Sequence, residues 1–157
     1  MNHDEHEDRE GHEGMKGYDE IAFGGHRMRL PSSLTPETER VMSATIGCAI
    51  AVHRTLGPGF LESIYRKAMC IELASSALSF ESERAVRVDY RGVSIEGQRV
   101  DLIVEGLVVV ELKAVNRLDD VHRSQLISYL RTLRLRAGLL VNFRVPVLRQ
   151  GLKRVVL

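Results

Sequence analysis

Tryptophan is absent from this chain of 157 residues, and phenylalanine and tyrosine contribute only four residues each. Cysteine is scarcer still: Cys48 and Cys70 do not form the CxxC spacing that indicates a zinc site. We interpret both as buried thiols in a reducing compartment. No apolar run reaches the roughly 20 residues that cross a bilayer, and the polar start is not a signal peptide. We therefore expect a cytoplasmic protein that does not enter the membrane.

Acidic residues are missing from the last part of the chain, since none occurs between Val121 and Leu157. The acids are concentrated at the other end: residues 1–20 hold eight of them against Arg9 and Lys16, and the net charge is only +1. This asymmetry favours an anionic partner, although basic side chains on solvated faces would also account for it. Eight basic residues lie in the acid-free stretch: Arg123, Arg131, Arg134, Arg136, Arg144, Arg149, Lys153 and Arg154.

The composition, with 44% hydrophobic and 27% charged residues, fits a single globular domain with a sizeable core. Residues 1–30 are polar, glycine-rich and without period, so we predict a flexible acidic tail followed by one domain over 31–157. His3, His6 and His12, which lie among the acids of the tail, could bind a divalent metal adventitiously. The oligomeric state stays open, a homo-oligomer included.

Apolar periodicity and turn residues predict three helices and five strands. Thr35 and Pro36 are typical of a helix start, and Gly57-Pro58 of a helix end. The order α-α-β-β-β-α-β-β predicts an α/β fold of the α+β kind, with a mixed sheet flanked by helices. The predicted segments are helices over 35–56, from 60 to the mid 70s and from 119 or 120 to about 133, and strands over 85–90, 98–104, 107–115, 137–143 and 152–157.

The stretch GPGFLESIY at 57–65 places Glu62 and Tyr65 three residues apart, on one face of the second predicted helix. Taken locally, Glu62 is an ordinary glutamate stabilised by the helix dipole. Tyr65 is similarly open between packing the helix and lining a site.

The stretch RVDLIVEGLVVVELKAV at 99–115 is typical of a β-hairpin. If Gly106 lies at the centre of a three-residue loop, Asp101 faces Glu111 and both carboxylates project from the same face of the sheet. Because like charges directly opposite destabilise a hairpin, a positive group should lie between them. Lys113 points to that face, since strand side chains alternate with period two.

Two carboxylates and a lysine on one face describe a site for a hard cation, and their oxygen ligands suit Mg²⁺ or Mn²⁺. The alternative is a surface hairpin with a Glu–Lys pair and an unrelated aspartate. Val108, Val109 and Val110 favour the metal site, because they indicate a central strand, where surplus charges are unusual.

These residues also carry a resemblance to known proteins. Asp101 followed by ELK at 111–113 resembles the motif of the PD-(D/E)xK nuclease superfamily, and GFLESIY at 59–65 resembles the signature of the GxxExxY proteins, a branch of it. The resemblance covers about 35–157. Val100 stands where the superfamily name has proline, and Arg144 where a glycine is frequent. Further matches are HRTLGPGFLESIY at 53–65, Gln125-x-x-x-Tyr129 and GLLVNF at 138–143.

The resemblance implies a restriction-endonuclease-like core and a role for each matching position. Asp101 and Glu111 match the metal-binding acids, Lys113 the lysine that assists the attacking water, and Glu62 a helix-borne acid that completes the metal site. Site-lining positions are Tyr65, Gln125 and Tyr129; the last two match a motif that borders the site in nucleases of the RecB type, and their i, i+4 spacing places them on one helix face.

The function implied is a Mg²⁺- or Mn²⁺-dependent nuclease that hydrolyses phosphodiester bonds of DNA or RNA. The alternative is a non-catalytic nucleic-acid-binding or regulatory protein that retains the nuclease fold. A third possibility is a protein-interaction module whose acidic tail masks its basic surface. The scarcity of aromatic residues argues against a platform for stacking single strands.

Overall fold

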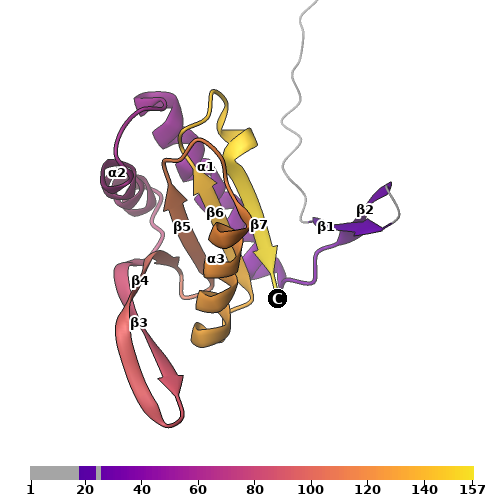
Figure 1. The fold of residues 1–157 in the computed structure, drawn as a ribbon. Coiled ribbons are helices and arrows are strands. Elements are labelled where there is room, and N and C mark those ends of the chain that lie inside the picture. The colour runs from indigo at the N-terminus through magenta and orange to yellow at the C-terminus, as the bar shows by residue number, and fades with distance from the viewer. Residues whose placement is uncertain (1–17, 24–25) are drawn as a thin grey trace, which may run out of the picture.

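The computed structural model describes residues 18–23 and 26–157. They form a two-stranded hairpin, a five-stranded mixed sheet and three α-helices (Figure 1). The predicted order of helices and strands is confirmed from residue 36 onward. The elements are β1 (Tyr18–Phe23), β2 (His26–Pro31), α1 (Pro36–Leu56), α2 (Glu62–Ser75), β3 (Phe80–Tyr90), β4 (Val93–Val104), β5 (Val108–Lys113), α3 (Asp120–Leu133), β6 (Ala137–Asn142), the 3₁₀ turn η1 (Leu148–Gly151) and β7 (Leu152–Val156).

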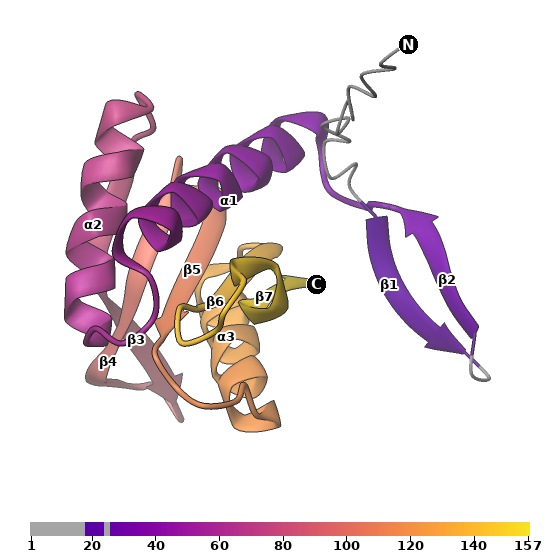
Figure 2. The same ribbon diagram turned by 90° about the horizontal axis from the view of Figure 1, so that it is seen from above.

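The large sheet has the strand order β3-β4-β5-β6-β7, in which only β5 and β6 are parallel. Helices α1 and α2 cover one face and α3 covers the other (Figure 2). Along β5, Val108, Val110 and Leu112 pack in the core beneath α1 and α2, whereas Val109 packs against α3. By alternation Glu111 and Lys113 therefore face the side of α3.

Helix α1 begins and ends where the sequence predicts. The side chain of Thr35 accepts a hydrogen bond from the backbone N–H of Thr38 at 3.2 Å, and Pro36 is the first helical residue. At the other end Gly57 adopts a φ of 66°, and its N–H donates to the carbonyl of His53 at 2.8 Å. The following turn leads directly into α2, which packs against α1.

The hairpin of β4 and β5 has the predicted register. Val104 pairs with Val108, Ile103 with Val109 and Leu102 with Val110. The backbone pairing of β4 with β5 ends there, one position before Asp101 and Glu111. From that point β4 continues with β3 alone, as a two-stranded arm that extends beyond the rest of the sheet (Figure 1).

The arm is longer than the sequence predicts, since β3 begins at Phe80 rather than Ala85 and β4 at Val93 rather than Gln98. The added segment of β3, FESER at 80–84, is mostly charged and polar and lacks apolar alternation, whereas the added segment of β4, VSIEG at 93–97, has only one short alternation, Val93 and Ile95. Backbone pairing forms them nonetheless: Glu81 pairs with Ile103, and Val88 with Ile95.

The hairpin of β1 and β2 lies within residues 1–30 and their immediate continuation, where the sequence predicts a tail without regular structure. Residues 1–17 and 24–25 lie outside the described residues, and His3, His6 and His12 are among them. Cys48 and Cys70 are free thiols, the first buried and the second half-buried. None of the helices in the described ranges is long and apolar enough to cross a membrane.

We predict that Gly151→Ala destabilises the protein by about 1–3 kcal/mol, because an added Cβ would overlap the carbonyl oxygen of Asn142 at the end of β6. Urea denaturation measures the difference. Gly47→Ala is the matched control: Gly47 lies exposed within α1 with no atom near the added Cβ, so alanine should stabilise the helix by about 0.5–1 kcal/mol. Equal stability of Gly151→Ala and wild type would contradict the prediction.

Candidate functional site

Glu111 and Lys113 lie on the central strand β5, whose neighbours are β4 and β6. Glu111 is buried, with 4% of its surface exposed. Its Oε1 accepts a hydrogen bond from Lys113 Nζ at 3.2 Å, and the same two atoms form an ion pair. Its Oε2 is buried and has no hydrogen-bond partner in the described part of the chain. One oxygen of this buried carboxyl group is therefore bonded within the protein and the other is not.

Asp101 lies on β4 at the point where the pairing with β5 has ended. Its Oδ2 accepts a hydrogen bond from the backbone N–H of Leu112 at 2.8 Å. The side chain of Asp101 thus takes over the link between the two strands and holds its carboxylate beside Glu111. Its Oδ1 lies 3.3 Å from Nη1 of Arg66. The sequence predicts one cation, Lys113, between the two acids; the structure instead gives each acid a cation of its own.

Helix α2 contributes Glu62 and Arg66. Glu62 is the first residue of the helix, and Arg66 follows at i+4 on the same face. Arg66 bridges two acids, since its Nη2 lies 3.2 Å from Oε1 of Glu83 on β3. Sequence reasoning missed Arg66, although its spacing from Glu62 was a signal that both belong to one face.

Tyr65 stabilises the turn that precedes α2. It is completely buried, and its ring stacks on Phe143 with centroids 4.3 Å apart and an interplanar angle of 3°. Its hydroxyl donates to the carbonyl of Gly57 at 2.6 Å and accepts from the N–H of Phe60 at 3.2 Å. The hydroxyl is thus bonded to the turn rather than to the acids, and Tyr65 fixes where the helix carrying Glu62 begins.

Helix α3 brings Gln125 and Tyr129 to the other side of Lys113. Gln125 Oε1 accepts from Lys113 Nζ at 3.3 Å, and Gln125 Nε2 donates to the hydroxyl of Tyr129 at 2.9 Å. The helix start is fixed by a capping box in which the Asp119 N–H donates to Nδ1 of His122 at 3.0 Å. Tyr129, Gln125, Lys113 and Glu111 therefore form one continuous chain of hydrogen bonds.

The site is poorly solvated and rich in negative charge. Burial and, to a smaller extent, the charge of Asp101 raise the pKa of Glu111 to about 7, although the charge of Lys113 opposes the shift. Burial also raises the pKa of Glu62, against the nearby charge of Lys113. Near the start of a helix a glutamate is ordinarily stabilised in its charged form, so burial outweighs the helix dipole here. Burial likewise raises the pKa of the Tyr129 hydroxyl.

These side chains fit a divalent cation bound by few protein ligands. Within residues 18–23 and 26–157, no three histidine, cysteine or acidic side chains are grouped closely enough to hold a metal ion. However, Asp101 and Glu111 are adjacent hard oxygen donors, and Glu111 Oε2 has no protein donor. Mg²⁺ commonly keeps several waters and takes one or two carboxylates together with phosphate oxygens, which this pair can provide.

We predict that the metal-free protein loses stability as the pH rises from about 4.5 to about 7. The pKa of Glu111 is raised from 4.5 to about 7 on folding, so in this window the unfolded chain releases its proton before the folded protein does. Glu111→Gln should remove much of this loss, which is on the order of 3 kcal/mol. Urea denaturation in EDTA at pH 5 and pH 8 tests it. The same pH dependence in variant and wild type would refute the assignment.

We predict that Tyr65→Phe destabilises the protein by about 1–2 kcal/mol, because the bonds to Gly57 and Phe60 are lost while the stacking on Phe143 is kept. Tyr90→Phe is the control, since Tyr90 is 60% exposed at the tip of the arm. The midpoints of urea denaturation should differ between the two variants. Indistinguishable midpoints would mean that the hydroxyl does not hold the turn.

The comparison with known families agrees with this geometry. The family model of the PD-(D/E)XK nuclease superfamily matches residues 39–155, from α1 to β7. No curated protein and no solved structure gave a significant match. The matched region contains both acids, the lysine on β5 and the mixed sheet that carries them. The chain belongs to the PD-(D/E)XK nuclease superfamily and has its restriction-endonuclease-like fold.

Proposed function

We propose that this protein is a Mg²⁺- or Mn²⁺-dependent nuclease that hydrolyses phosphodiester bonds of nucleic acids. The observation that carries the proposal is the buried Glu111 Oε2, which has no hydrogen-bond partner in the described residues and lies beside Asp101 and Lys113. An unsatisfied buried carboxylate is costly. A cation between the two acids would offset that cost and could also bind an anionic substrate.

Asp101 and Glu111 would hold the metal, and Glu62 would support it from the start of α2. A bound divalent cation would supply positive charge to the phosphate and make a water more acidic. The bond from Leu112 N–H holds Asp101 in place, and burial within the sheet holds Glu111. The turn fixed by Tyr65 sets the position of Glu62.

Lys113 would orient the attacking water and offset the negative charge that develops on the phosphate. Glu111 and Gln125 hold its ammonium group from two sides, and Tyr129 in turn orients Gln125. The lysine is therefore held in one position before substrate arrives. Such preorganisation is what an electrostatic catalyst requires.

We assign the protein to the GxxExxY branch of the superfamily because each residue of that signature has a distinct task. Gly59 adopts a φ of 116°, which favours glycine. Glu62 opens α2 beside the acids, and Tyr65 closes the turn. We infer that the signature acts as one unit that directs Glu62 toward Asp101 and Glu111.

The acid-free C-terminal stretch supports nucleic acid as the anionic partner, since Arg and Lys dominate phosphate contacts. Some of its basic residues have structural partners: Arg154 bonds Glu39 at 2.5 Å, and Arg136 donates to the carbonyl of Leu157 at 2.7 Å. The exposed members remain for phosphate contact: Arg123, Arg131, Arg134, Arg144, Arg149 and Lys153.

The second candidate function is nucleic-acid binding without cleavage. One observation favours it: both carboxylate oxygens of Asp101 already have protein partners, Arg66 and the backbone of Leu112. A metal would have to compete with Arg66 for this aspartate. Salt-sensitive binding without cleavage in Mg²⁺ or Mn²⁺ would favour this function.

We predict that Asp101→Asn and Lys113→Met each lower Mg²⁺-dependent cleavage by about 100-fold or more, because each removes a charge that the reaction uses. Gel assays on single-stranded and duplex DNA and RNA measure the rate. Calorimetry with Mn²⁺ should show weaker binding to Asp101→Asn. Lys67→Met, which removes an exposed lysine of α2 outside the acid-free stretch, is the control and should cleave normally. Normal cleavage by both site variants would overturn the proposal.

A further inference from the structure

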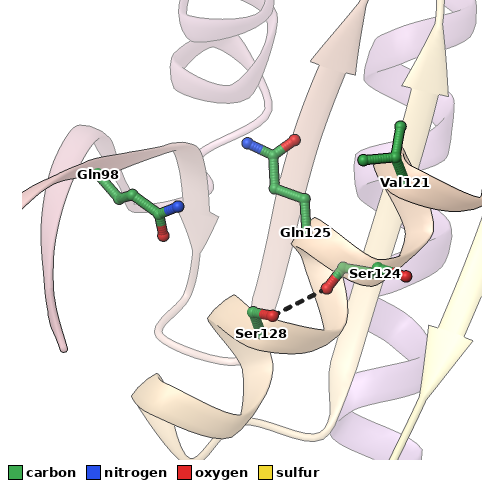
Figure 3. A pocket seen from close by; sticks show the side chains of 5 residues that line it. All are labelled: Gln98, Val121, Ser124, Gln125 and Ser128. Carbon is green, nitrogen blue, oxygen red and sulfur yellow. Dashed lines mark hydrogen bonds between the residues drawn. The ribbon is translucent and has the colours of Figure 1, made fainter. Parts of the chain in front are cut away.

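A groove of about 430 Å³ lies between the arm and α3, lined by Gln98, Val121, Ser124, Gln125 and Ser128 (Figure 3). It follows from the split in the sheet: β4 separates from β5 at Asp101 and continues with β3, while α3 remains packed on the sheet. Gln98 extends from the arm toward α3, and Gln125 extends from α3 into the space between them (Figure 3).

The groove is continuous with the candidate active site through Gln125. The same side chain that lines the groove accepts a hydrogen bond from Lys113 Nζ at 3.3 Å. A phosphate held at Lys113 would therefore lie at one end of the groove. The group attached to that phosphate, a nucleoside, would be directed along it.

The lining carries no charge: it consists of two amides, two hydroxyls and one valine. A pocket for phosphate would be expected to carry arginine or lysine. Amides and hydroxyls instead match the donors and acceptors at the edges of nucleobases, and a valine provides apolar contact. The chemistry of the groove is thus that of a base rather than of the backbone.

Two of these polar groups are available for a ligand. Gln125 is bonded to Lys113 and Tyr129, and the hydroxyl of Ser128 donates to the carbonyl of Ser124 at 3.0 Å. Within the described residues, the Gln98 amide and the Ser124 hydroxyl form no hydrogen bond with the protein. They belong to opposite walls, so one planar group between them could bond to both.

The backbone next to Gln98 is shaped by a β-bulge. Val86 pairs with Gln98 and Val88 with Ile95, so one residue of β3 lies opposite two of β4, Glu96 and Gly97. Gly97 adopts a φ of 133°, which side chains rarely allow. Bulges redirect side chains beside active sites, and this one immediately precedes the residue that reaches into the groove.

We propose that the groove binds the base of an unpaired nucleotide adjacent to the scissile phosphate, with Gln98 and Ser124 as its hydrogen-bonding residues. The inference rests on the proposed nuclease function and adds the class of substrate. The volume is in the range of small-molecule pockets, roughly 300–1,000 Å³, which suits a base and not a duplex. Single-stranded nucleic acid, or a strand end splayed from a duplex, is therefore the substrate.

The test is binding of a fluorescent 12-nucleotide single strand and of the same sequence as a blunt duplex, by anisotropy in EDTA so that no cleavage occurs. The single strand should bind more tightly to wild type. Gln98→Leu and Ser124→Val should each weaken single-strand binding by about tenfold, because each removes a base contact, and should leave duplex binding unchanged. Matched controls are Gln150→Leu and Ser43→Val, which change exposed residues outside the groove.

Cleavage assays separate this inference from the nuclease proposal. Wild type should cleave the single strand faster in Mg²⁺, and the two groove variants should lose that preference. Cleavage of both forms at equal rates, unaffected by either variant, would overturn the groove assignment while leaving the nuclease proposal intact. A different result would overturn the nuclease proposal and keep the groove as a binding site: wild type cleaves neither form, but the two groove variants still bind the single strand more weakly than wild type does.

Discussion

The hydrogen bond from the Leu112 N–H to the Asp101 carboxylate is the constraint on which the rest of the site depends. The pairing of β4 with β5 ends at Leu102 and Val110, and beyond it this side chain joins the strands in place of a backbone bond. Two consequences follow. One acid is fixed beside the other at the end of the central strand, and β4 is free to leave the sheet with β3, which opens the groove toward α3.

The arrangement concentrates charge where proteins usually avoid it. Glu111 is 4% exposed, and the pKa values of Glu62 and Glu111 are both raised, first by burial. Lys113 and Arg66 offset part of the negative charge, one at each carboxylate of the strand pair. The free-energy cost of burying these charges is offset in part by the fixed packing around them. Tyr65 stacks on Phe143 on one side, and Gln125 is hydrogen-bonded to Tyr129 on the other. Buried charges of this kind occur where function requires them.

Much of the fold and of the candidate site is predictable from the sequence, because the features involved are set by residues close together in the chain. The start of α1 follows from Thr35-Pro36, and the register of β4 with β5 follows from Gly106 and the valines that flank it. The register then brings Asp101, Glu111 and Lys113 together, because strand side chains alternate. Gln125 and Tyr129 share a helix face through their spacing alone.

What the sequence did not predict depends on distant contacts. Arg66 reaches Asp101, 35 residues further along the chain, and only the packing of α2 beside β4 brings them together. The arm was underestimated because its polar residues are held by backbone pairing rather than by an apolar pattern. Tyr65 could be assigned to the helix but not to the turn, since its ring is held by stacking on the distant Phe143 while its hydroxyl bonds to Gly57 and Phe60. The hairpin of β1 and β2 was not predicted either, although Met28 and Leu30 alternate with Arg27 and Arg29 in the sequence of β2.

We propose that Asp101 and Glu111 together hold a divalent metal. A crystal structure of the protein soaked in Mn²⁺, with anomalous differences recorded, tests it most directly. We expect an anomalous peak within bonding distance of Glu111 Oε2 and an Asp101 oxygen, with the contact between Arg66 and Asp101 lengthened or broken. A map without a peak at saturating Mn²⁺, with Arg66 still bonded to Asp101, would contradict it.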